Sequence, residues 1–439
     1  MTANNFEWFQ NAITTISNDD NNRTQVLSEL KLAISSLNVP QLRLITRSLQ
    51  LNVIFDCLNS SDTEQVKVTC DVLEMLLLSL EPGVVLGQYG YCMRRALSHP
   101  GACSKKLAIK ELQRIANDDA VLKNMGIPRD MLLLVVASIC HEDMSVASST
   151  MSLLVKLGST PFGLQCLFSE SVQLALRGAM SRRDIVRFRV YEVMVDIAVQ
   201  SQEGLDAADK SGMLPNLLKE LRGPDVLLQL NCLELLTNLA LCDHGLHYLE
   251  HHGILKSLAA KVSAIDEDPL ASLILPGLIK FFGNVAQARP KEVFAEYPAM
   301  VKALFETFQS PDLVLLGVAM ETVGYIGTTV EGKYMLASLG ETMDSTMKCL
   351  ADKISDLPTE WRVRALNTVA NLLKLKESDQ DTQSLELTKS WFEHLSSDPM
   401  SVVMSVCRQP FIELRLAGLQ ILQVLAEQQW GQEYINKTP

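Results

Sequence analysis

Apolar residues recur with helical spacing along almost the whole chain, and the stretch 225–263 shows the pattern most clearly. Asp225 follows a Gly-Pro pair and is predicted to cap a long helix over 226–240. A short helix over 246–252 ends at Gly253, a residue suited to a left-handed helix end. A third helix follows over 254–262, and strand signals are nearly absent. The pattern therefore predicts an all-α fold built from a long, a short and a third helix.

The same three-part unit recurs at a period of about 40 residues. Asp143, Asp184 and Asp225 stand one such period apart. These residues and Asp312 are each followed at one constant offset by a glycine (Gly163, Gly204, Gly245 and Gly332), and at a second constant offset by Ser171, Gly212, Gly253 and Gly340. Such a period is typical of a helical solenoid, in which each unit buries its apolar face against its neighbours. The three-helix unit favours the armadillo arrangement over the two-helix HEAT arrangement.

We therefore predict one all-α, armadillo/HEAT-like, right-handed superhelical solenoid that occupies residues 1–439 as a single domain. Two or three amphipathic capping helices are expected in 1–60, core repeats in 61–375 and a C-terminal repeat in 385–439, with a final helix over 411–427. A linker is expected at 376–384 and a lengthened acidic loop at 264–269.

Composition narrows the class of protein further. The 439 residues carry a net charge of −12, which argues against general nucleic-acid binding because that needs a basic surface. The ten cysteines show neither a CxxC pair nor metal-ligand spacing, so we expect reduced thiols in helix cores. We see neither a secretory signal nor an apolar run long enough for a membrane span. A cytoplasmic protein, also found in the nucleus, is expected.

Candidate chemistry is sparse. Four histidines at helical spacing (His244, His247, His251 and His252) form the strongest metal candidate. Leu246 and Leu249 already define the buried side of that helix, so an exposed polar face explains the histidines better. Nucleophile elbows, P-loops and dinucleotide fingerprints are missing. Three glycines that fall inside a predicted helix (Gly317, Gly324 and Gly327) suit close packing rather than phosphate binding. We expect no enzyme, metal or cofactor.

Polar residues along the long helices are the candidate partner-binding positions, because solenoids grip a partner with such rows. Four arginines also stand close together in this otherwise acidic chain, and arginine is favoured in protein interfaces. Local pairing with Glu192, Asp184 or Asp225 is the competing explanation of that cluster. The predicted positions are Arg182, Arg183, Arg187, Arg189, Glu192, Asn231, Glu234, Asn238, Lys280, Asn284, Glu321 and Tyr325.

Several segments closely resemble the 26S proteasome non-ATPase regulatory subunit 5 family. They are DIVRFRVYEV (184–193), LPGLIKFFGNVA (275–286), GVAMETVGYIG (317–327), VEGK (330–333) and SWFEHLSSDP (390–399). The likeness covers nearly the whole chain in order and is weakest over 1–60.

This resemblance implies an assembly chaperone for the base of the 19S regulatory particle. Such a protein binds the C-terminal domain of an AAA ATPase subunit, travels with a large non-ATPase scaffold subunit and leaves before the particle matures. The family has no catalytic residues to transfer. Its members continue beyond the segment that matches 430–436, whereas this chain stops at Pro439, which implies a shortened C-terminal repeat.

A second function class stays open, namely an armadillo-type transport adaptor that binds basic peptides. Adaptors of that type place a tryptophan four residues before each groove asparagine. Here Glu234 precedes Asn238 and Lys280 precedes Asn284 at that spacing. The tryptophan–asparagine ladder is thus missing, and a basic-peptide binding assay would separate the two readings.

Overall fold

The computed structural model describes residues 3–263 and 271–438, and every regular element within these ranges is helical. The prediction of an all-α solenoid is confirmed. The chain divides into two compact units, Met1–Pro215 (unit 1) and Asn216–Pro439 (unit 2). Each unit is described by itself. That residues 1–439 form one right-handed superhelical domain stays a prediction.

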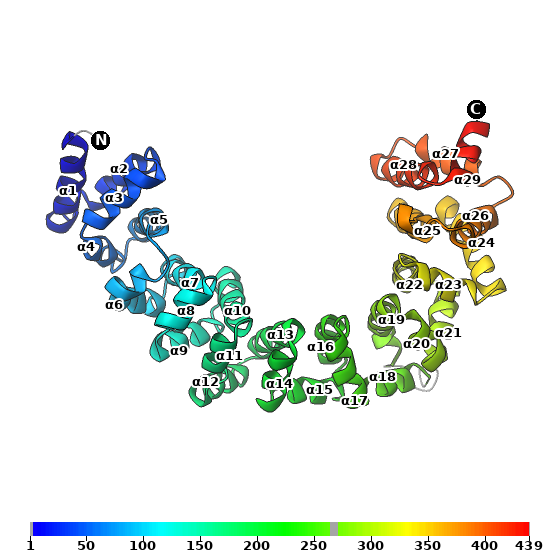
Figure 1. Cartoon of the computed structure of the whole chain (residues 1–439), viewed down its shortest axis with the longest axis horizontal. Helices are drawn as coiled ribbons and strands as arrows, with labels where there is room; N and C mark the ends of the chain where they lie inside the picture. The colour runs from blue at the N-terminus through cyan, green and yellow to red at the C-terminus, as the bar shows by residue number, and fades with distance from the viewer. Residues whose placement is uncertain (1–2, 264–270, 439) are drawn as a thin grey trace. The chain divides into compact units, whose positions relative to one another are not determined.

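Unit 1 has two helical layers (Figure 1). The helices α2, α5, α7, α10 and α13 contact one another in succession, and α4, α6, α9 and α12 form the second layer. The helices are α1 (Ala3–Asn18), α2 (Arg23–Ser35), α3 (Val39–Ser48), α4 (Leu51–Asp56), α5 (Thr63–Leu78), α6 (Val84–Ser98), α7 (Ala102–Ala116), α8 (Asp119–Met125), α9 (Arg129–Ser138), α10 (Met144–Gly158), α11 (Pro161–Leu167), α12 (Glu170–Met180), α13 (Asp184–Gln200) and α14 (Gln202–Lys210).

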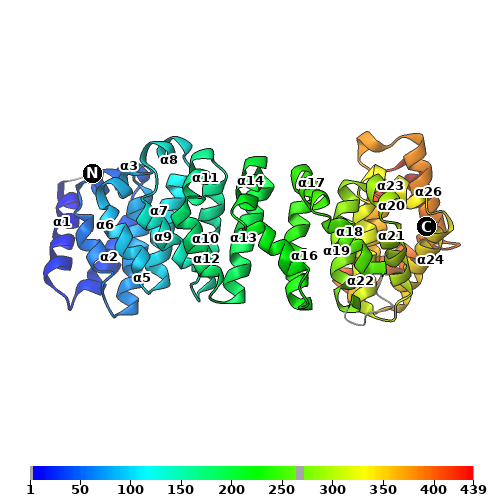
Figure 2. The ribbon, with the colours of Figure 1, turned by 90° about the horizontal axis from the view of Figure 1, so that it is seen from below.

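Unit 2 repeats this plan. Its long helices α16, α19, α22, α25 and α28 contact one another in succession, and Figure 2 shows α19 and α22 side-on. After α15 (Met213–Leu221), which contains the unit boundary, come α16 (Val226–Ala240), α17 (Asp243–His251), α18 (Ile254–Ser263), α19 (Ala271–Ala288), α20 (Pro290–Glu296), α21 (Pro298–Glu306), α22 (Leu313–Ile326), α23 (Val330–Ala337), α24 (Glu341–Asp356), α25 (Thr359–Leu373), α26 (Thr382–Leu395), α27 (Pro399–Cys407), α28 (Ile412–Ala426) and α29 (Gln429–Lys437), with 3₁₀ turns η1 (Thr307–Gln309) and η2 (Glu377–Asp379).

The repeated aspartates cap the long helices in three of the four sequence repeats that contain them. The carboxylate of Asp225 accepts the N–H groups of Leu227 and Leu228 at the start of α16, as predicted. Asp143 and Asp312 do the same for α10 and α22. Asp184 differs, because it is the first residue inside α13 and Arg183 stands at the cap without a side-chain bond. One repeat therefore lacks the cap that stabilises its neighbours.

The glycines that follow the repeated aspartates at the first constant offset (Gly163, Gly204, Gly245 and Gly332) all lie inside helices. These glycines lie in the first turn of a short helix that passes close to the end of the preceding long helix. A Cβ atom on Gly163 would lie 2.2 Å from the main-chain oxygen of Leu157, and one on Gly332 would lie 2.0 Å from that of Ile326. Glycine is required here by close approach of two backbones. Gly253, by contrast, has a φ of +66° and ends α17 in the left-handed conformation, as predicted.

Basic side chains close many of the helix ends. The last carbonyl groups of a helix lack intrahelical partners and carry partial negative charge. A lysine or arginine from another segment supplies the missing donor. Such main-chain carbonyl contacts are made by Arg23, Lys105, Arg114, Arg177, Arg189, Arg222, Lys333 and Arg362. These eight basic side chains therefore help to close helix ends within the fold.

The ends of the chain and two connections differ from the sequence reading. The described residues 3–60 form four helices, whereas two or three were expected. Two further helices, α27 and α29, flank the helix expected over 411–427. The connection expected at 376–384 is shorter, since α26 begins at Thr382 with Asp381 as its cap. The loop expected at 264–269 lies outside the described residues.

Among the described residues no single helix is long and apolar enough to cross a membrane. The bent pair α22 and α23 passes the length and composition test together, with 118° between the two helices. Because α22 packs against both α19 and α25, burial within the solenoid accounts for its apolar sequence.

Candidate functional site

Four of the predicted partner-binding residues lie together in a groove of unit 2. Lys280 and Asn284 come from α19, and Glu321 and Tyr325 come from α22. We call this the α19–α25 groove, because α25 completes it. Its volume is about 440 Å³, and its other lining residues are Gly283, Val318, Thr322, Arg364, Asn367, Thr368 and Asn371.

Small residues bring the three helices close enough to share one surface. A Cβ atom on Gly283 of α19 would lie 2.3 Å from the Thr322 side chain of α22. A Cβ atom on Gly324 of α22 would lie 3.0 Å from the Cα of Thr368 in α25. The hydroxyl of Thr368 donates to the main-chain oxygen of Met320 at 2.9 Å. The predicted close packing of Gly317, Gly324 and Gly327 is confirmed, although Gly327 lies directly after α22 and not inside it.

Of the two basic side chains in the groove, one forms ion pairs and the other does not. Arg364 donates to Glu321 at 2.8 Å and to Glu360 at 2.9 Å, and its guanidinium lies 4.7 Å from the ring centre of Trp361. Lys280 is exposed, and within the described part of the chain its ammonium group makes no ion pair. In the groove, the charge of Arg364 is therefore balanced by Glu321, and the positive charge of Lys280 is available to a partner.

Amide side chains provide the remaining polar surface. Asn367 is exposed, and Asn284 and Asn371 are half-buried at the same end of their helices. The side chain of Asn284 donates to the main-chain oxygen of Lys280 at 2.7 Å, which leaves its carbonyl oxygen to accept. Carboxamide groups can both donate and accept. They are therefore suited to main-chain groups of a partner segment.

The other predicted residues of unit 2 stand next to the groove. Asn231, Glu234 and Asn238 are exposed on α16, which packs against α19. They do not line the groove itself. They extend the exposed polar face of the long helices by one helix.

The arginine cluster of unit 1 separates into two kinds of residue. Arg182 and Arg183 are exposed, and Arg183 lies 3.7 Å from Glu142. Arg187 pairs with Asp184 at 2.8 Å, which is the local pairing weighed above. Arg189 is only 7% exposed. Its Nη1 donates to the main-chain oxygens of Ile139 and His141, at 2.8 Å and 3.0 Å. Arg189 therefore closes the end of α9, and burial takes it out of any partner-binding surface.

Glu192 lies in a separate cleft of unit 1, about 520 Å³ in volume, between α10 and α13. Asp196 lines the same cleft one turn further on, and burial raises the pKa of its carboxyl group. Ser148, Ser152 and Lys156 face these residues from α10. The cleft is polar, but no side chain arrangement in it resembles a catalytic set.

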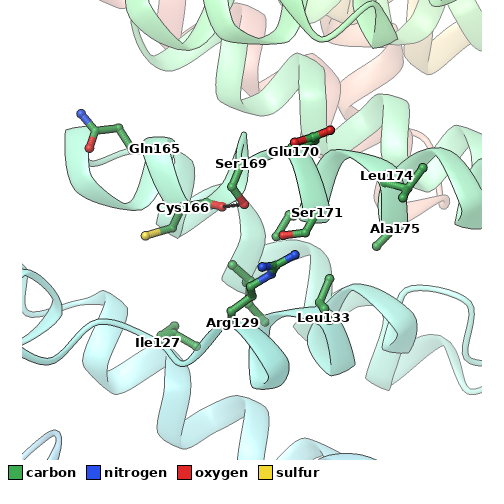
Figure 3. A pocket seen from close by; sticks show the side chains of 12 residues that line it. Ile127, Arg129, Leu133, Gln165, Cys166, Ser169, Glu170, Ser171, Leu174 and Ala175 are labelled. Carbon is green, nitrogen blue, oxygen red and sulfur yellow. Dashed lines mark hydrogen bonds between the residues drawn. The ribbon is translucent and has the colours of Figure 1, made fainter.

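A third cleft lies between α9, α11 and α12 and measures about 960 Å³. Figure 3 shows Arg129 and Leu133 on its α9 side, and Ser171 and Leu174 on its α12 side. The hydroxyl of Ser169 donates to the main-chain oxygen of Cys166 at 2.8 Å, and burial raises the pKa of the Cys166 thiol. A hydroxyl turned to a carbonyl and a thiol held protonated do not form a nucleophilic site.

The four histidines of α17 and its C-cap are not arranged like metal ligands. Nε2 of His244 lies 3.5 Å from the sulfur of Cys242, while Nδ1 of His252 lies 2.8 Å from the main-chain oxygen of Tyr248. Within residues 3–263 and 271–438 no three histidine, cysteine or acidic side chains gather as metal ligands would.

Sequence reasoning missed the α25 side of the groove. Arg364, Asn367 and Asn371 follow the spacing i, i+3 and i+7, and so do Gly277, Lys280 and Asn284 in α19. Extending the polar row by one more helix would have found them. The step from Asp312 to Pro358, the cap position of α25, is longer than the spacing between the earlier aspartates. A search at that constant spacing therefore passes over this helix.

Solved structures similar to this fold include karyopherins. The karyopherin Kap121p bound to the SUMO protease Ulp1p matches with a TM-score of 0.70 and 12% identity over 97% of this chain and 42% of that one. Kap121p bound to the extreme C-terminus of the protein phosphatase Cdc14p gives a TM-score of 0.68 at 11% identity, over 95% of this chain and 41% of that one. At this identity the likeness shows the solenoid fold alone.

Sequence comparison gives a closer relationship. The family model described as proteasome non-ATPase 26S subunit matches residues 5–439. The human protein named 26S proteasome non-ATPase regulatory subunit 5 is 34% identical over 94% of this chain and 82% of its own length. The protein of that name from Drosophila melanogaster is 27% identical over 93% of this chain and 81% of its own length. This chain therefore belongs to the 26S proteasome non-ATPase regulatory subunit 5 family.

Proposed function

We propose that this protein is an assembly chaperone for the base of the 26S proteasome regulatory particle. It binds the C-terminal domain of an AAA ATPase subunit, in company with a large non-ATPase scaffold subunit, and leaves before the particle matures. It acts as a non-catalytic monomer in the cytoplasm and nucleus. Family membership over the whole chain carries this proposal, because the relatives are named as proteasome subunits.

The mechanism we propose is steric. A solenoid offers a long surface that can cover a small helical domain, and the α19–α25 groove supplies amides and one uncommitted lysine for its recognition. A bound ATPase domain is then shielded from premature contacts. Release follows when a later subunit competes for the same volume. An interface of about 1,200–2,000 Å² is enough for a specific complex of this kind.

Co-purification tests the proposal. A tagged chain is isolated from cells and its complexes are separated on native gels. We expect base precursors that contain ATPase subunits. Mature, doubly capped proteasomes as the main partner, without such precursors, would contradict the proposal.

A groove variant tests the surface. Asn367→Arg places a bulky charged side chain on an exposed position of the groove, so it should reduce ATPase recovery without unfolding α25. Gln165→Arg is the matched control, because Gln165 is an exposed residue at the unit 1 cleft of Figure 3. Equal loss with both variants would remove the groove from the proposal.

A further inference from the structure

Beyond α25, the last helix that lines the α19–α25 groove, the next long helix is α28, and its exposed face is aliphatic where that of α25 is polar. The buried positions of α25 and α28 align without a gap. Ala365, Leu366 and Leu373 correspond to Ala417, Gly418 and Leu425. In the same alignment the groove residues Arg364, Asn367 and Asn371 correspond to Leu416, Leu419 and Gln423. Since α25 and α28 are packed together, the two sets belong to one continuous surface.

The aliphatic set on α28 is strongly exposed. Ile412, Leu416 and Leu419 are 57%, 60% and 52% exposed, and they follow the spacing i, i+4 and i+7 along one helix face. The neighbouring Phe411 is 53% exposed. A contiguous exposed apolar face marks an interaction site more often than scattered apolar residues do. We call Ile412, Leu416 and Leu419 the α28 ridge.

The opposite end of the same surface, on α19, carries a positive charge. Arg364 is already neutralised by Glu321 and Glu360, whereas Lys280 on α19 makes no ion pair within the described residues. A partner therefore gains an ion pair by placing a carboxylate at α19, and it gains apolar burial by placing aliphatic side chains at α28. The surface is thus complementary to a partner segment that is acidic at one end and aliphatic at the other.

The distance between these ends fits one secondary-structure element. Packed helices lie about 8–10 Å apart, so the three steps from α19 through α22 and α25 to α28 cover roughly 25–30 Å. A helix of about 20 residues has this length.

We propose that unit 2 takes one amphipathic helix of its partner in a fixed direction, with an acidic residue at Lys280 and aliphatic residues on the α28 ridge. This inference rests on the proposed function, since the partner that would carry the helix is a proteasomal AAA ATPase C-terminal domain. It adds the chemistry of the bound element and its polarity along the solenoid.

The test measures binding of the full chain to purified C-terminal domains of the base ATPase subunits. Leu416→Gln and Leu419→Gln should each weaken binding about tenfold, because a leucine side chain that becomes buried in the complex is lost. Lys280→Glu should weaken binding by a similar factor at low salt and less at high salt. Leu174→Gln is the matched control, because Leu174 is 69% exposed in the unit 1 cleft of Figure 3.

Orientation gives an independent readout. A photo-crosslinking residue at position 280 and another at position 416 should label opposite ends of one helix of the bound domain. Labels on two unrelated surfaces, or on the same end, would overturn the inference while leaving the chaperone proposal intact.

Four other outcomes would each overturn part or all of the two proposals. Normal binding by Leu416→Gln and Leu419→Gln, together with loss in Asn367→Arg, would overturn the ridge but keep the groove. Loss only in Leu174→Gln would move the aliphatic contact to unit 1. A dimer in light scattering that Leu416→Gln dissolves would show that the ridge binds a second copy instead. Failure of the unaltered chain to bind any ATPase domain would overturn both proposals.

Discussion

The ammonium group of Lys333 in α23 donates to the main-chain oxygen of Asn371 in α25, at 3.0 Å, although its side chain is only 1% exposed. The same nitrogen also contacts the main-chain oxygen of Gly327 at the end of α22. One buried lysine thus holds the ends of two helices that line the α19–α25 groove. Asn371 is itself a groove residue, so this contact holds the main chain at one of the positions that line the groove.

Replacement of Lys333 by methionine should destabilise the protein. The two carbonyl groups would be left buried without a donor, which costs about 1–3 kcal/mol for each unsatisfied group. Urea unfolding measures the change. Lys302→Met, at an exposed position of α21, is the control and should change stability by less than about 0.5 kcal/mol. A Lys333→Met protein as stable as the unaltered chain would contradict the role assigned to this contact.

Lys333 should also make stability depend on pH. Burial lowers the pKa of its ammonium group from 10.5 to about 7, whereas in the unfolded chain the group keeps its ordinary value. Between these two pKa values the unfolded state binds more protons, so the free energy of unfolding should rise as the pH increases from about 7 to 10. Below pH 7 both states are protonated and the dependence disappears.

The measurement is chemical unfolding at several pH values. The comparison with Lys333→Met isolates the lysine, because other groups titrate equally in both proteins. A difference between the two proteins that stays constant from pH 7 to 10 would contradict the lowered pKa.

Two arginines of the unit 1 cluster should differ in their effect on the stability of the protein. Arg189→Met removes the donors to Ile139 and His141 and should cost about 1–3 kcal/mol of stability. Arg182→Ser changes an exposed side chain and should leave stability within about 0.5 kcal/mol. Thermal unfolding distinguishes them. Equal stability of the two variants would show that α9 does not need this arginine at its end.

Two glycines in unit 1 should respond to alanine with opposite signs. A Cβ atom on Gly163 would meet the Leu157 oxygen at 2.2 Å, whereas one on Gly178 would meet nothing within 4 Å. Gly163→Ala should therefore destabilise the protein. Gly178→Ala lies inside α12 and should stabilise it by up to about 1 kcal/mol, because alanine favours helix more than glycine does. Shifts of the urea midpoint in the same direction would contradict the close approach of α11 to α10.

Sequence periodicity determined the fold class, because apolar spacing and cap residues act through neighbours within one turn of helix. The bounds of α16 agree with the prediction. Asp225 caps the start of α16 and Gly253 follows the end of α17, both as expected. The role of Gly163 could not be read in this way, since the oxygen that forbids a side chain there belongs to the preceding helix.

The sequence by itself also placed Lys280, Asn284, Glu321 and Tyr325 on exposed helix faces, because their spacing puts them opposite the apolar stripe. Only tertiary structure decided that α25 completes their groove and that Arg189 and Lys333 are buried at helix ends. Those decisions depend on which carbonyl groups of other helices come within reach of a long basic side chain. Contacts between residues far apart in the sequence, such as those of Lys333 and Arg189, are fixed by packing and leave no local signal in the chain.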